Sequence, residues 1–306
     1  MLAVAAIGIV LFFYVGFYCY KAYGLAYENC HPKRAAVAEP EGIPYGQSKF
    51  SFVSKGGAVL SAVEWLPNKE IKGTVIACHY LGGSKNAIYP YVEPLLREGF
   101  RVTAFDYPNH GESMDQKGLK YDLEEDMQLF LSRLKERGIN GPYGVMGLSM
   151  GASLALSAAG LCDEIRVVIV DSGPLIFVRE YVDYVLRTKH IKHPIERWAF
   201  TFLSLYVVGF QKMSRKLLRR IEHYKDLPIL MIHGKKDHTI SPENTAYLYK
   251  QLNTEGARRI VVEGAHHLTN RILLGTKYDE MIVDFVKKNL GERTYEEGQN
   301  SKNSAG

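Results

Sequence analysis

Three residues far apart in the sequence, Ser149, Asp237 and His267, are of the types that together turn a hydroxyl group into a nucleophile. A serine hydroxyl attacks poorly at neutral pH unless a base takes its proton and a carboxylate orients that base. Ser149 lies in a G-x-S-x-G pattern, residues 147–151, between an apolar run and a series of small residues typical of a helix start. A strand that turns directly into a helix requires little bulk two residues before and after the serine, and it directs free helix N–H groups toward the serine. The pattern therefore predicts Ser149 as the nucleophile of an acyl-transfer reaction.

Asp237 is the predicted orienting acid. It lies in a loop after the apolar residues 229–232, where a buried strand is expected to end. In an open parallel sheet, functional groups gather where the strands end at the carboxyl edge. Asp171 meets the same condition after residues 166–170 and remains an alternate, whereas Glu243 follows a serine–proline pair that is typical of a helix start.

His267 is the predicted general base, and its neighbour His266 is the alternate. Both follow residues 259–262, which are expected to form the last strand. Two histidines at the end of the last strand of such a sheet are well placed to reach a serine at the same edge.

Two backbone N–H groups are needed to stabilise the negative oxygen that forms during acyl transfer. One is predicted at Met150, directly after the nucleophile. The second is predicted in the segment 79–84, which follows an apolar strand. Two glycines in this segment allow the backbone to approach a substrate closely.

Strand and helix patterns alternate from residue 48 to residue 290. Strands are predicted at 50–53, 59–65, 74–78, 100–105, 143–146, 166–170, 229–232 and 259–262, and helices at 87–97, 123–137, 152–161, 247–252 and 278–290. Apolar strands separated by helices predict a mainly parallel sheet covered on both faces, with the leading hairpin as an antiparallel edge. The expected fold class is therefore α/β, with a mostly parallel eight-stranded sheet in one domain, residues 48–290.

A long insertion, residues 174–227, separates the last two predicted strands from the others. It is rich in aromatic and aliphatic residues and shows little β alternation, so we predict a helical cap. Two roles are open for this cap. It covers the sheet as a purely structural element, or its apolar face lines an acyl pocket beside Ser149 while the basic residues near its end face anionic lipid headgroups. These basic residues are Lys212, Arg215, Lys216, Arg219 and Arg220. Residues 291–306, rich in Gly, Asn, Ser and Glu, predict a disordered tail.

The first residues predict a membrane anchor. Residues 2–20 carry no charge, and as a helix they would extend about 28 Å, close to the thickness of the hydrocarbon core. We expect a retained single-pass helix followed by a polar linker, residues 21–47; the alternatives are a cleaved signal peptide and a buried core helix. The side of the main domain stays open, although Lys21, Lys33 and Arg34 slightly favour the cytoplasm.

Composition excludes several other classes of protein. The net charge of +5 is mild and the Lys and Arg residues are scattered, so nucleic acid is not an expected partner. The four cysteines show no C-x-x-C pair and no zinc-ligand spacing, so neither a disulfide scaffold nor a metal site is predicted.

Together these motifs resemble the α/β-hydrolase superfamily, and within it the serine-aminopeptidase-like and monoacylglycerol-lipase-like branch, including members with an N-terminal membrane anchor. The resemblance covers about residues 50–290 and rests on residues 79–84, D-Y-P-N-H-G-E-S at 106–113, the Ser149 pattern, H-G-x-x-D ending at Asp237 and G-A-x-H ending at His267.

The resemblance implies the chain order serine, acid, histidine, favours His267 over His266, and implies no metal and no organic cofactor. It also implies that the second N–H donor belongs to Leu81, with Tyr80 as the alternate. Two departures stand out, because Tyr80 and Asn109 occupy positions where this family usually has glycine.

The sequence thus predicts a membrane-anchored serine hydrolase that forms an acyl-enzyme. An ester substrate is preferred because the aromatic cap suits an apolar acyl group; a peptidase or amidase of the same fold is the alternative. A catalytically inactive binding protein is a third hypothesis. It predicts that at least one residue of the triad is replaced, whereas this sequence has a serine, an acid and a histidine at all three positions. The expected partners are a small acyl ester or peptide substrate and membrane lipid.

Overall fold

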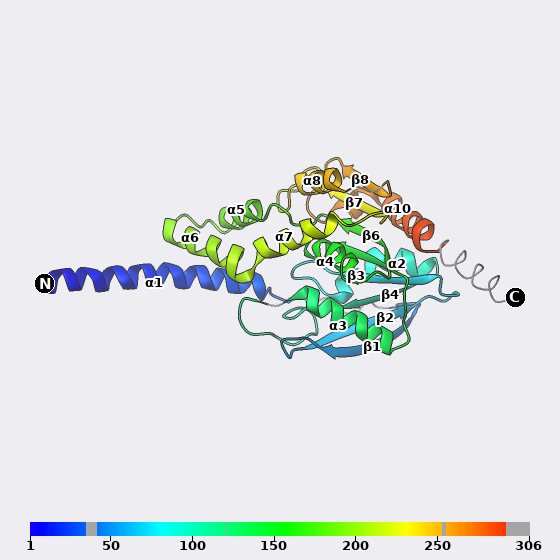
Figure 1. Cartoon of the computed structure of the whole chain (residues 1–306), viewed down its shortest axis with the longest axis horizontal. Coiled ribbons are helices and arrows are strands. Elements are labelled where there is room, and N and C mark those ends of the chain that lie inside the picture. The colour runs from blue at the N-terminus through cyan, green and yellow to red at the C-terminus, as the bar shows by residue number, and fades with distance from the viewer. Residues whose placement is uncertain (35–41, 121, 253–254, 292–306) are drawn as a thin grey trace.

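An eight-stranded sheet forms the centre of the molecule in the computed structural model, which describes residues 1–34, 42–120, 122–252 and 255–291 (Figure 1). The strands are β1 (Gly46–Val53), β2 (Val59–Leu66), β3 (Gly73–Cys78), β4 (Phe100–Phe105), β5 (Tyr143–Leu148), β6 (Ile165–Asp171), β7 (Ile229–Gly234) and β8 (Ala257–Val262). Their order is β1-β2-β4-β3-β5-β6-β7-β8. The β1–β2 and β2–β4 pairs are antiparallel and all other pairs are parallel, which confirms the predicted fold class.

Helices cover both faces of this sheet. They are α2 (Lys85–Arg97), α3 (Leu123–Glu136), α4 (Met150–Ala159), α7 (Phe210–Ile221), α8 (Glu243–Gln251), α9 (Asn270–Leu274), α10 (Thr276–Val286) and a terminal π-helical turn η2 (Lys287–Gly291). The α3, α4, α7 and α8 helices pack apolar side chains on one face, whereas α2 and α10 pack on the other. The central strands are buried on both sides, which explains why β5 reads as a continuous apolar run without polar alternation.

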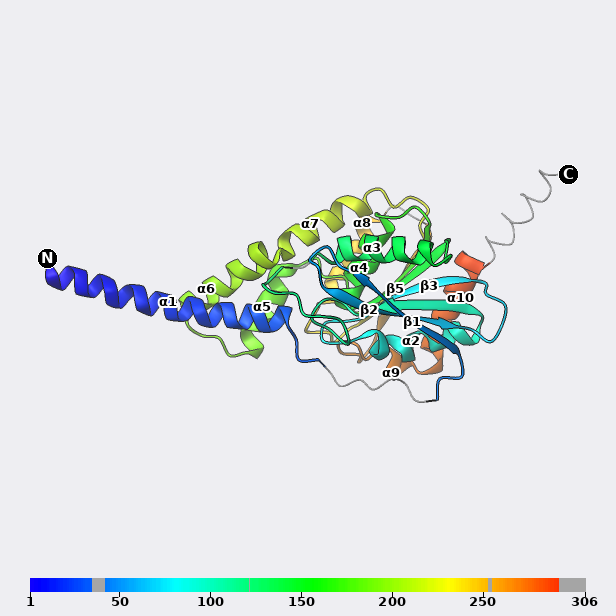
Figure 2. The same ribbon diagram turned by 90° about the horizontal axis from the view of Figure 1, so that it is seen from below.

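The insertion between β6 and β7 is helical. It contains α5 (Val178–Thr188), α6 (Pro194–Phe202), the π-helical segment η1 (Leu203–Val208) and α7. We refer to residues 174–227 as the cap, which extends away from the sheet toward the N-terminal helix (Figures 1 and 2).

One cluster of salt bridges joins the cap to helix α3, which packs on the sheet. Arg220 of α7 donates to both carboxylate oxygens of Glu124 in α3 at 2.5 and 3.1 Å, and Lys216 lies 3.3 Å from the same carboxylate. These two cations are therefore paired within the protein, whereas Lys212, Arg215 and Arg219 are exposed.

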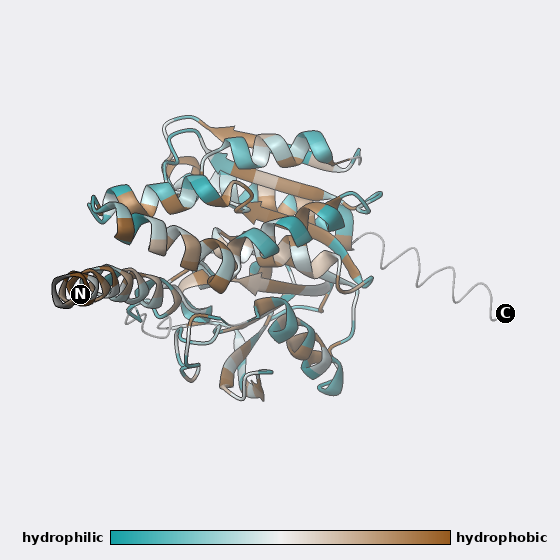
Figure 3. Ribbon diagram, turned by 60° about the vertical axis from the view of Figure 1, so that its left-hand side comes forward, coloured by the Kyte–Doolittle hydropathy of each residue, from teal (hydrophilic) through white to brown (hydrophobic). Residues whose placement is uncertain are grey.

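The first helix, α1 (Leu2–Cys30), continues ten residues beyond the predicted end at residue 20 and occupies part of the predicted linker. Its second half is held by burial, because Ala22, Leu25 and Ala26 pack in one cluster with cap residues such as Val182 and Phe200. Its first half projects from the rest of the molecule with Val4 to Phe17 exposed, and the residues of this half are mostly apolar (Figure 3).

By length and composition, residues Val4–Cys30 could cross a membrane. Linker residues 35–41 and the predicted tail at 292–306 lie outside the described residues.

The α3 helix contains a buried carboxyl group whose environment predicts a pH effect. Asp126 is 2 % exposed, and its Oδ2 has no hydrogen-bond partner among the described residues. Burial, reinforced by Asp122 and Glu125, raises the pKa of Asp126 from 3.8 to about 7 against the opposing hydrogen bond from the Lys55 backbone. The folded state therefore prefers the protonated form, and stability is lost as the pH rises from about 4 to about 7.

We expect Asp126→Asn to remove this loss. Unfolding of the detergent-solubilised full chain should show a variant more stable than wild type at pH 8, by at most about 4 kcal/mol, and an advantage that disappears near pH 4. An advantage of the same size at both pH values would contradict the ionisation account.

Candidate active site

A sharp turn between β5 and α4 presents Ser149. The serine has φ +53° and ψ −113°, outside helical geometry. A Cβ atom at Gly147 would lie 2.0 Å from the Gly151 carbonyl oxygen, and one at Gly151 would lie 2.1 Å from the Cys78 carbonyl oxygen. Both positions thus require glycine, which is the physical reason for the G-x-S-x-G pattern.

The side chains of Ser149, His267 and Asp237 meet at the carboxyl edge of the sheet. They follow β5, β8 and β7 respectively. The Ser149 Oγ lies 2.9 Å from His267 Nε2, and His267 Nδ1 lies 2.7 Å from Asp237 Oδ2. With the proton of the neutral ring on Nδ1, the ring donates to Asp237 and its Nε2 accepts from the Ser149 hydroxyl. The structure therefore brings together the three residues that the sequence singled out first.

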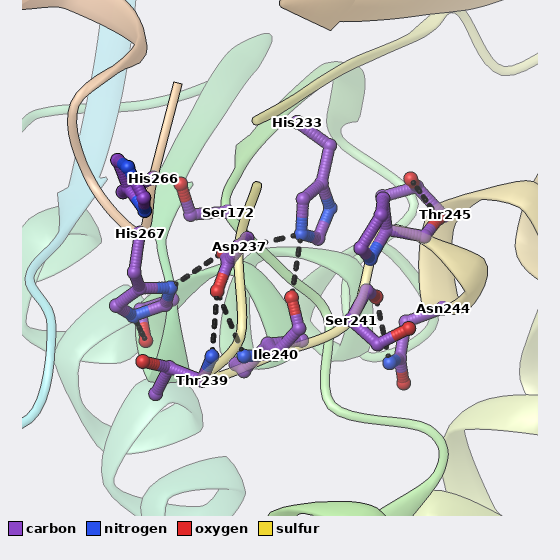
Figure 4. A network of polar contacts seen from close by, with 12 residues as sticks. Ser172, His233, Asp237, Thr239, Ile240, Ser241, Asn244, Thr245, His266 and His267 are labelled. Atoms are coloured by element: carbon purple, nitrogen blue, oxygen red, sulfur yellow. Dashed lines mark hydrogen bonds and ion pairs between the residues drawn. The ribbon is translucent and has the colours of Figure 1, made fainter. Parts of the chain in front are cut away.

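Asp237 is a buried carboxylate with four hydrogen-bonding neighbours. Figure 4 shows His267 on one side and His233 on the other, with the backbone N–H groups of Thr239 and Ile240 donating to Oδ1 at 2.9 and 3.0 Å. Burial raises the pKa of Asp237, but the hydrogen bonds from His233, His267 and the Ile240 backbone outweigh it and lower the pKa from 3.8 to about 2. The carboxylate is consequently ionised throughout the neutral range.

His233 is a neighbour of Asp237 to which the sequence alone assigned no role in the site. Its Nε2 donates to the Ile240 carbonyl at 2.8 Å and lies 3.3 Å from Asp237 Oδ2. The ring is fully buried. The signal in the sequence was the spacing of four residues in H-G-x-x-D, which brings the ring back onto the carboxylate across one tight turn.

The alternate acid and base lie elsewhere. Asp171 is buried and accepts hydrogen bonds from Ser172 Oγ, Asn270 Nδ2 and Tyr278 Oη at 2.6–2.7 Å, and among the described residues its carboxylate has no hydrogen bond to a histidine. Its pKa is raised by burial. The backbone N–H of His266 donates to Thr269 Oγ1, and its ring lies apart from Asp237 (Figure 4).

The predicted oxyanion segment follows β3 and borders the site. Both Tyr80 and Leu81 line the cavity beside Ser149, as does Met150. His79 holds the segment, since its Nδ1 donates to the Tyr80 carbonyl at 2.8 Å and its Nε2 accepts from the Tyr107 N–H at 3.2 Å. A Cβ at Gly83 would lie 3.0 Å from the Tyr80 ring, so the missing side chain at Gly83 makes room for a tyrosine in this loop.

A cavity of about 290 Å³ opens beside Ser149 and His267. Its walls are mostly apolar and come from α4 and from the cap, with contributions from Leu154, Leu175, Val178, Tyr181, Phe210, Met213 and Leu217. Charged groups also line it, namely Lys120, Asp122, Glu124, Lys212 and Lys216. Within the described residues, no cluster of three or more His, Cys, Asp or Glu side chains is arranged to hold a metal ion.

Comparison with known proteins agrees with this architecture. Residues 69–211 match the family model described as serine aminopeptidase, S33. The solved structure of the *Pyrococcus furiosus* esterase Pf2001 superposes with a TM-score of 0.70 at 21 % identity, covering 86 % of this chain and 98 % of that one. The chain has the α/β-hydrolase fold.

Further matches to known proteins cover most of this chain. A cold-adapted esterase from an Arctic intertidal metagenomic library has a TM-score of 0.60 at 18 % identity, over 83 % of this chain and 97 % of that one. The uncharacterized protein YfhR of *Escherichia coli* K12 is 26 % identical over 79 % of this chain and 81 % of its own length. The uncharacterized protein YqkD of *Bacillus subtilis* is 28 % identical over 64 % of this chain and 65 % of its own length.

The contacts of the two buried aspartates predict different consequences of mutation. Asp237→Asn should lower kcat on p-nitrophenyl acetate by roughly 10³-fold or more with little change in KM, because it misorients the His267 imidazole. Asp171→Asn should instead lower the Tm, since it disturbs three buried hydrogen bonds, and should leave most of kcat. An inactive Asp171→Asn beside an active Asp237→Asn would place the acid on β6.

Proposed function

We propose that this α/β-hydrolase is a membrane-anchored serine hydrolase that cleaves carboxylic esters through an acyl-enzyme. Ser149 is the nucleophile, His267 the general base and Asp237 the acid that orients it. The observation that carries the proposal is the single imidazole ring within hydrogen-bond distance of both partners, 2.9 Å from the serine oxygen and 2.7 Å from the carboxylate.

The geometry supports a two-step reaction. In the first step Ser149 Oγ attacks the acyl carbonyl carbon while its proton passes to His267 Nε2. The imidazolium formed is stabilised by Asp237, and it returns the proton to the departing alcohol as the ester C–O bond breaks. In the second step a water molecule attacks the acyl-serine with His267 again as base, which releases the acid and restores the serine.

The negative oxygen of each tetrahedral intermediate needs donors that are already in position. We assign one to the N–H of Met150, at the start of α4, where the helix dipole adds to the stabilisation. The second is assigned to the N–H of Leu81, with that of Tyr80 as the alternate on the same loop.

The cavity favours an ester with an apolar acyl group. Its walls are apolar near Ser149, and burying each methylene group contributes roughly 0.8 kcal/mol. An aminopeptidase would need an unpaired carboxylate to bind the α-ammonium group of its substrate. The two carboxylates that line the cavity are already engaged, because Asp122 caps α3 and Glu124 pairs with Arg220 and Lys216.

Peptidase activity is the second candidate, and the matched family description, serine aminopeptidase, favours it. An inactive binding protein is disfavoured because all three catalytic positions carry competent residues in hydrogen-bond contact.

The membrane assignment rests on α1. Residues Val4–Cys30 are long and apolar enough for a span by length and composition, and residues 4–17 are exposed. The tyrosines Tyr14, Tyr18, Tyr20 and Tyr23 gather toward the end of the uncharged run, as an interfacial aromatic belt would. Its buried half, packed against the cap, favours retention of the helix over cleavage as a signal peptide.

Replacement of the proposed nucleophile and base gives the first test. Ser149→Ala should abolish labelling by a fluorophosphonate probe together with esterase turnover, because no other group replaces the attacking oxygen. His267→Ala should lower kcat by roughly 10³-fold or more, whereas His266→Ala should retain most of it. Turnover by Ser149→Ala near the wild-type level would exclude the mechanism.

A substrate series tests the acyl pocket. Lengthening the acyl group of a p-nitrophenyl ester from two to eight carbons should raise kcat/KM stepwise, by up to about fourfold per methylene, until the cavity is filled. Aminoacyl p-nitroanilides serve as the matched amide series. A flat ester series combined with good anilide turnover would support the peptidase instead.

A further inference from the structure

Three large aromatic side chains lie exposed on one face of the cap. Trp198, Phe202 and Tyr206 are 66 %, 47 % and 65 % exposed. They are four residues apart along the continuous helix α6–η1. The Trp198 and Phe202 rings stack with centroids 5.8 Å apart, and the Phe202 and Tyr206 rings are tilted with centroids 5.5 Å apart. We call these residues the aromatic face. The opposite side of the same helix is buried through Phe200 and Leu205, so the exposure is not a result of loose packing.

The start of α6 is fixed against the apolar part of α1. The Tyr14 hydroxyl lies 2.8 Å from His193 Nε2, and the Tyr18 ring stacks on the His193 ring at 3.4 Å. Lys21 pairs with the buried Glu196 at 3.1 Å. Both ribbon views show α6 beside α1 (Figures 1 and 2).

These contacts fix the position of the cap along α1, and therefore its depth in any membrane that α1 crosses. The uncharged run of α1 ends at Tyr20, and Lys21 is the charge that marks its end. Tyr14 lies about 10 Å further along the helix than Lys21, on the apolar side. The polar interface of one leaflet is roughly 5–8 Å thick. A span that ends near Lys21 therefore carries His193 and the start of α6 at least as deep as the interface, because the offset of about 10 Å exceeds the thickness of that layer.

The charge of the cap agrees with this depth. Residues 174–227 contain eleven Lys or Arg and five Asp or Glu, so their formal charge of +6 exceeds the +5 of the entire chain. The turn that reaches α1, residues 189–193, reads Lys-His-Ile-Lys-His, and Lys192 is exposed. Basic side chains beside exposed tryptophan and tyrosine are the composition of protein surfaces that rest in lipid headgroups.

The aromatic face also continues toward the cavity. Tyr206 and Val207 are exposed, and the next residues, Val208 to Phe210, line the cavity. Met213 belongs to both surfaces, because it lines the cavity and is also 39 % exposed.

We propose that the aromatic face and residues 189–193 lie in the headgroup layer of the bilayer that α1 crosses, and that the cavity takes its acyl substrate from that layer. The inference rests on the membrane anchor of the proposed function and narrows its substrate class to acyl esters dissolved in the membrane.

Tryptophan fluorescence tests the depth directly, because the chain has two tryptophans and Trp65 is fully buried in the sheet. Full-length protein is reconstituted into phosphatidylcholine vesicles with a minor fraction of phosphatidylglycerol, with or without bromine atoms near the headgroup end of the acyl chains. Brominated lipid should lower the emission of the wild type, and Trp198→Phe, which keeps only Trp65, should lose this quenching.

Carbonate extraction of the same vesicles separates the two proposals. Release of the protein would overturn the anchor, and this inference with it. Retention of the protein with Trp198 unquenched would leave the anchor intact and overturn the membrane contact. Concentration-dependent burial of Trp198 in vesicles, without quenching, would assign the aromatic face to a second copy of the chain.

Turnover provides an independent readout. The double variant Trp198→Ser/Phe202→Ser should hydrolyse soluble p-nitrophenyl acetate at a rate close to wild type but a vesicle-embedded long-chain ester about tenfold more slowly. Tyr249→Ser on α8, another exposed aromatic at 46 %, is the matched control and should change neither rate. Equal losses on both substrates in the double variant would contradict delivery from the membrane.

Discussion

The approach of the α4 backbone to the ends of β3 and β5 is the constraint on which the site depends. The Cα of Gly151 lies so close to the Cys78 carbonyl that no side chain fits between them. Cys78 is the last residue of β3 and directly precedes the His79 segment. The contact that forces glycine into the turn therefore also fixes the proposed oxyanion loop relative to the serine, so the proposed nucleophile and its proposed N–H donors form one backbone unit.

The buried negative charge of Asp237 is the second feature on which the site depends. A carboxylate without partners at this depth would be protonated, because burial penalises the ionised form. Two backbone N–H groups and two imidazoles reverse that preference. Asp171, on the neighbouring strand, receives neutral donors and keeps a raised pKa. Two aspartates at equivalent strand ends thus have pKa values shifted in opposite directions by their surroundings.

The sequence was sufficient to predict the sheet, the turn at Ser149 and the first-choice residues of the candidate triad, because each of these depends on a local pattern of residues. It left Asp171 and His266 open, since choosing between strand ends requires the contacts of Tyr278, Asn270 and Thr269. The extension of α1 past residue 20 was missed because Ala22, Leu25 and Ala26 gain their burial from a cap more than 150 residues later. The pairing of Lys216 and Arg220 with Glu124 was hidden for the same reason.

Asn109, one of the two departures from the family pattern, contacts the end of α1. It adopts φ +67°, a conformation that asparagine tolerates better than most residues. Its Nδ2 donates to the Cys30 carbonyl at the end of α1 at 3.0 Å, and its Oδ1 accepts from the Gln116 N–H at 2.7 Å. A glycine would supply the same backbone conformation but neither hydrogen bond.

The end of α1 is held at further points, since Cys30 Sγ donates to the Leu119 carbonyl and His31 Nε2 donates to the Gln116 carbonyl. The helix is thus docked on the body at its end and on the cap along its second half. In the proposed membrane-bound state, these contacts, rather than a flexible tether, set the direction in which the cavity faces the bilayer. Loosening them would leave the chemistry of Ser149 intact and change only which substrates reach it.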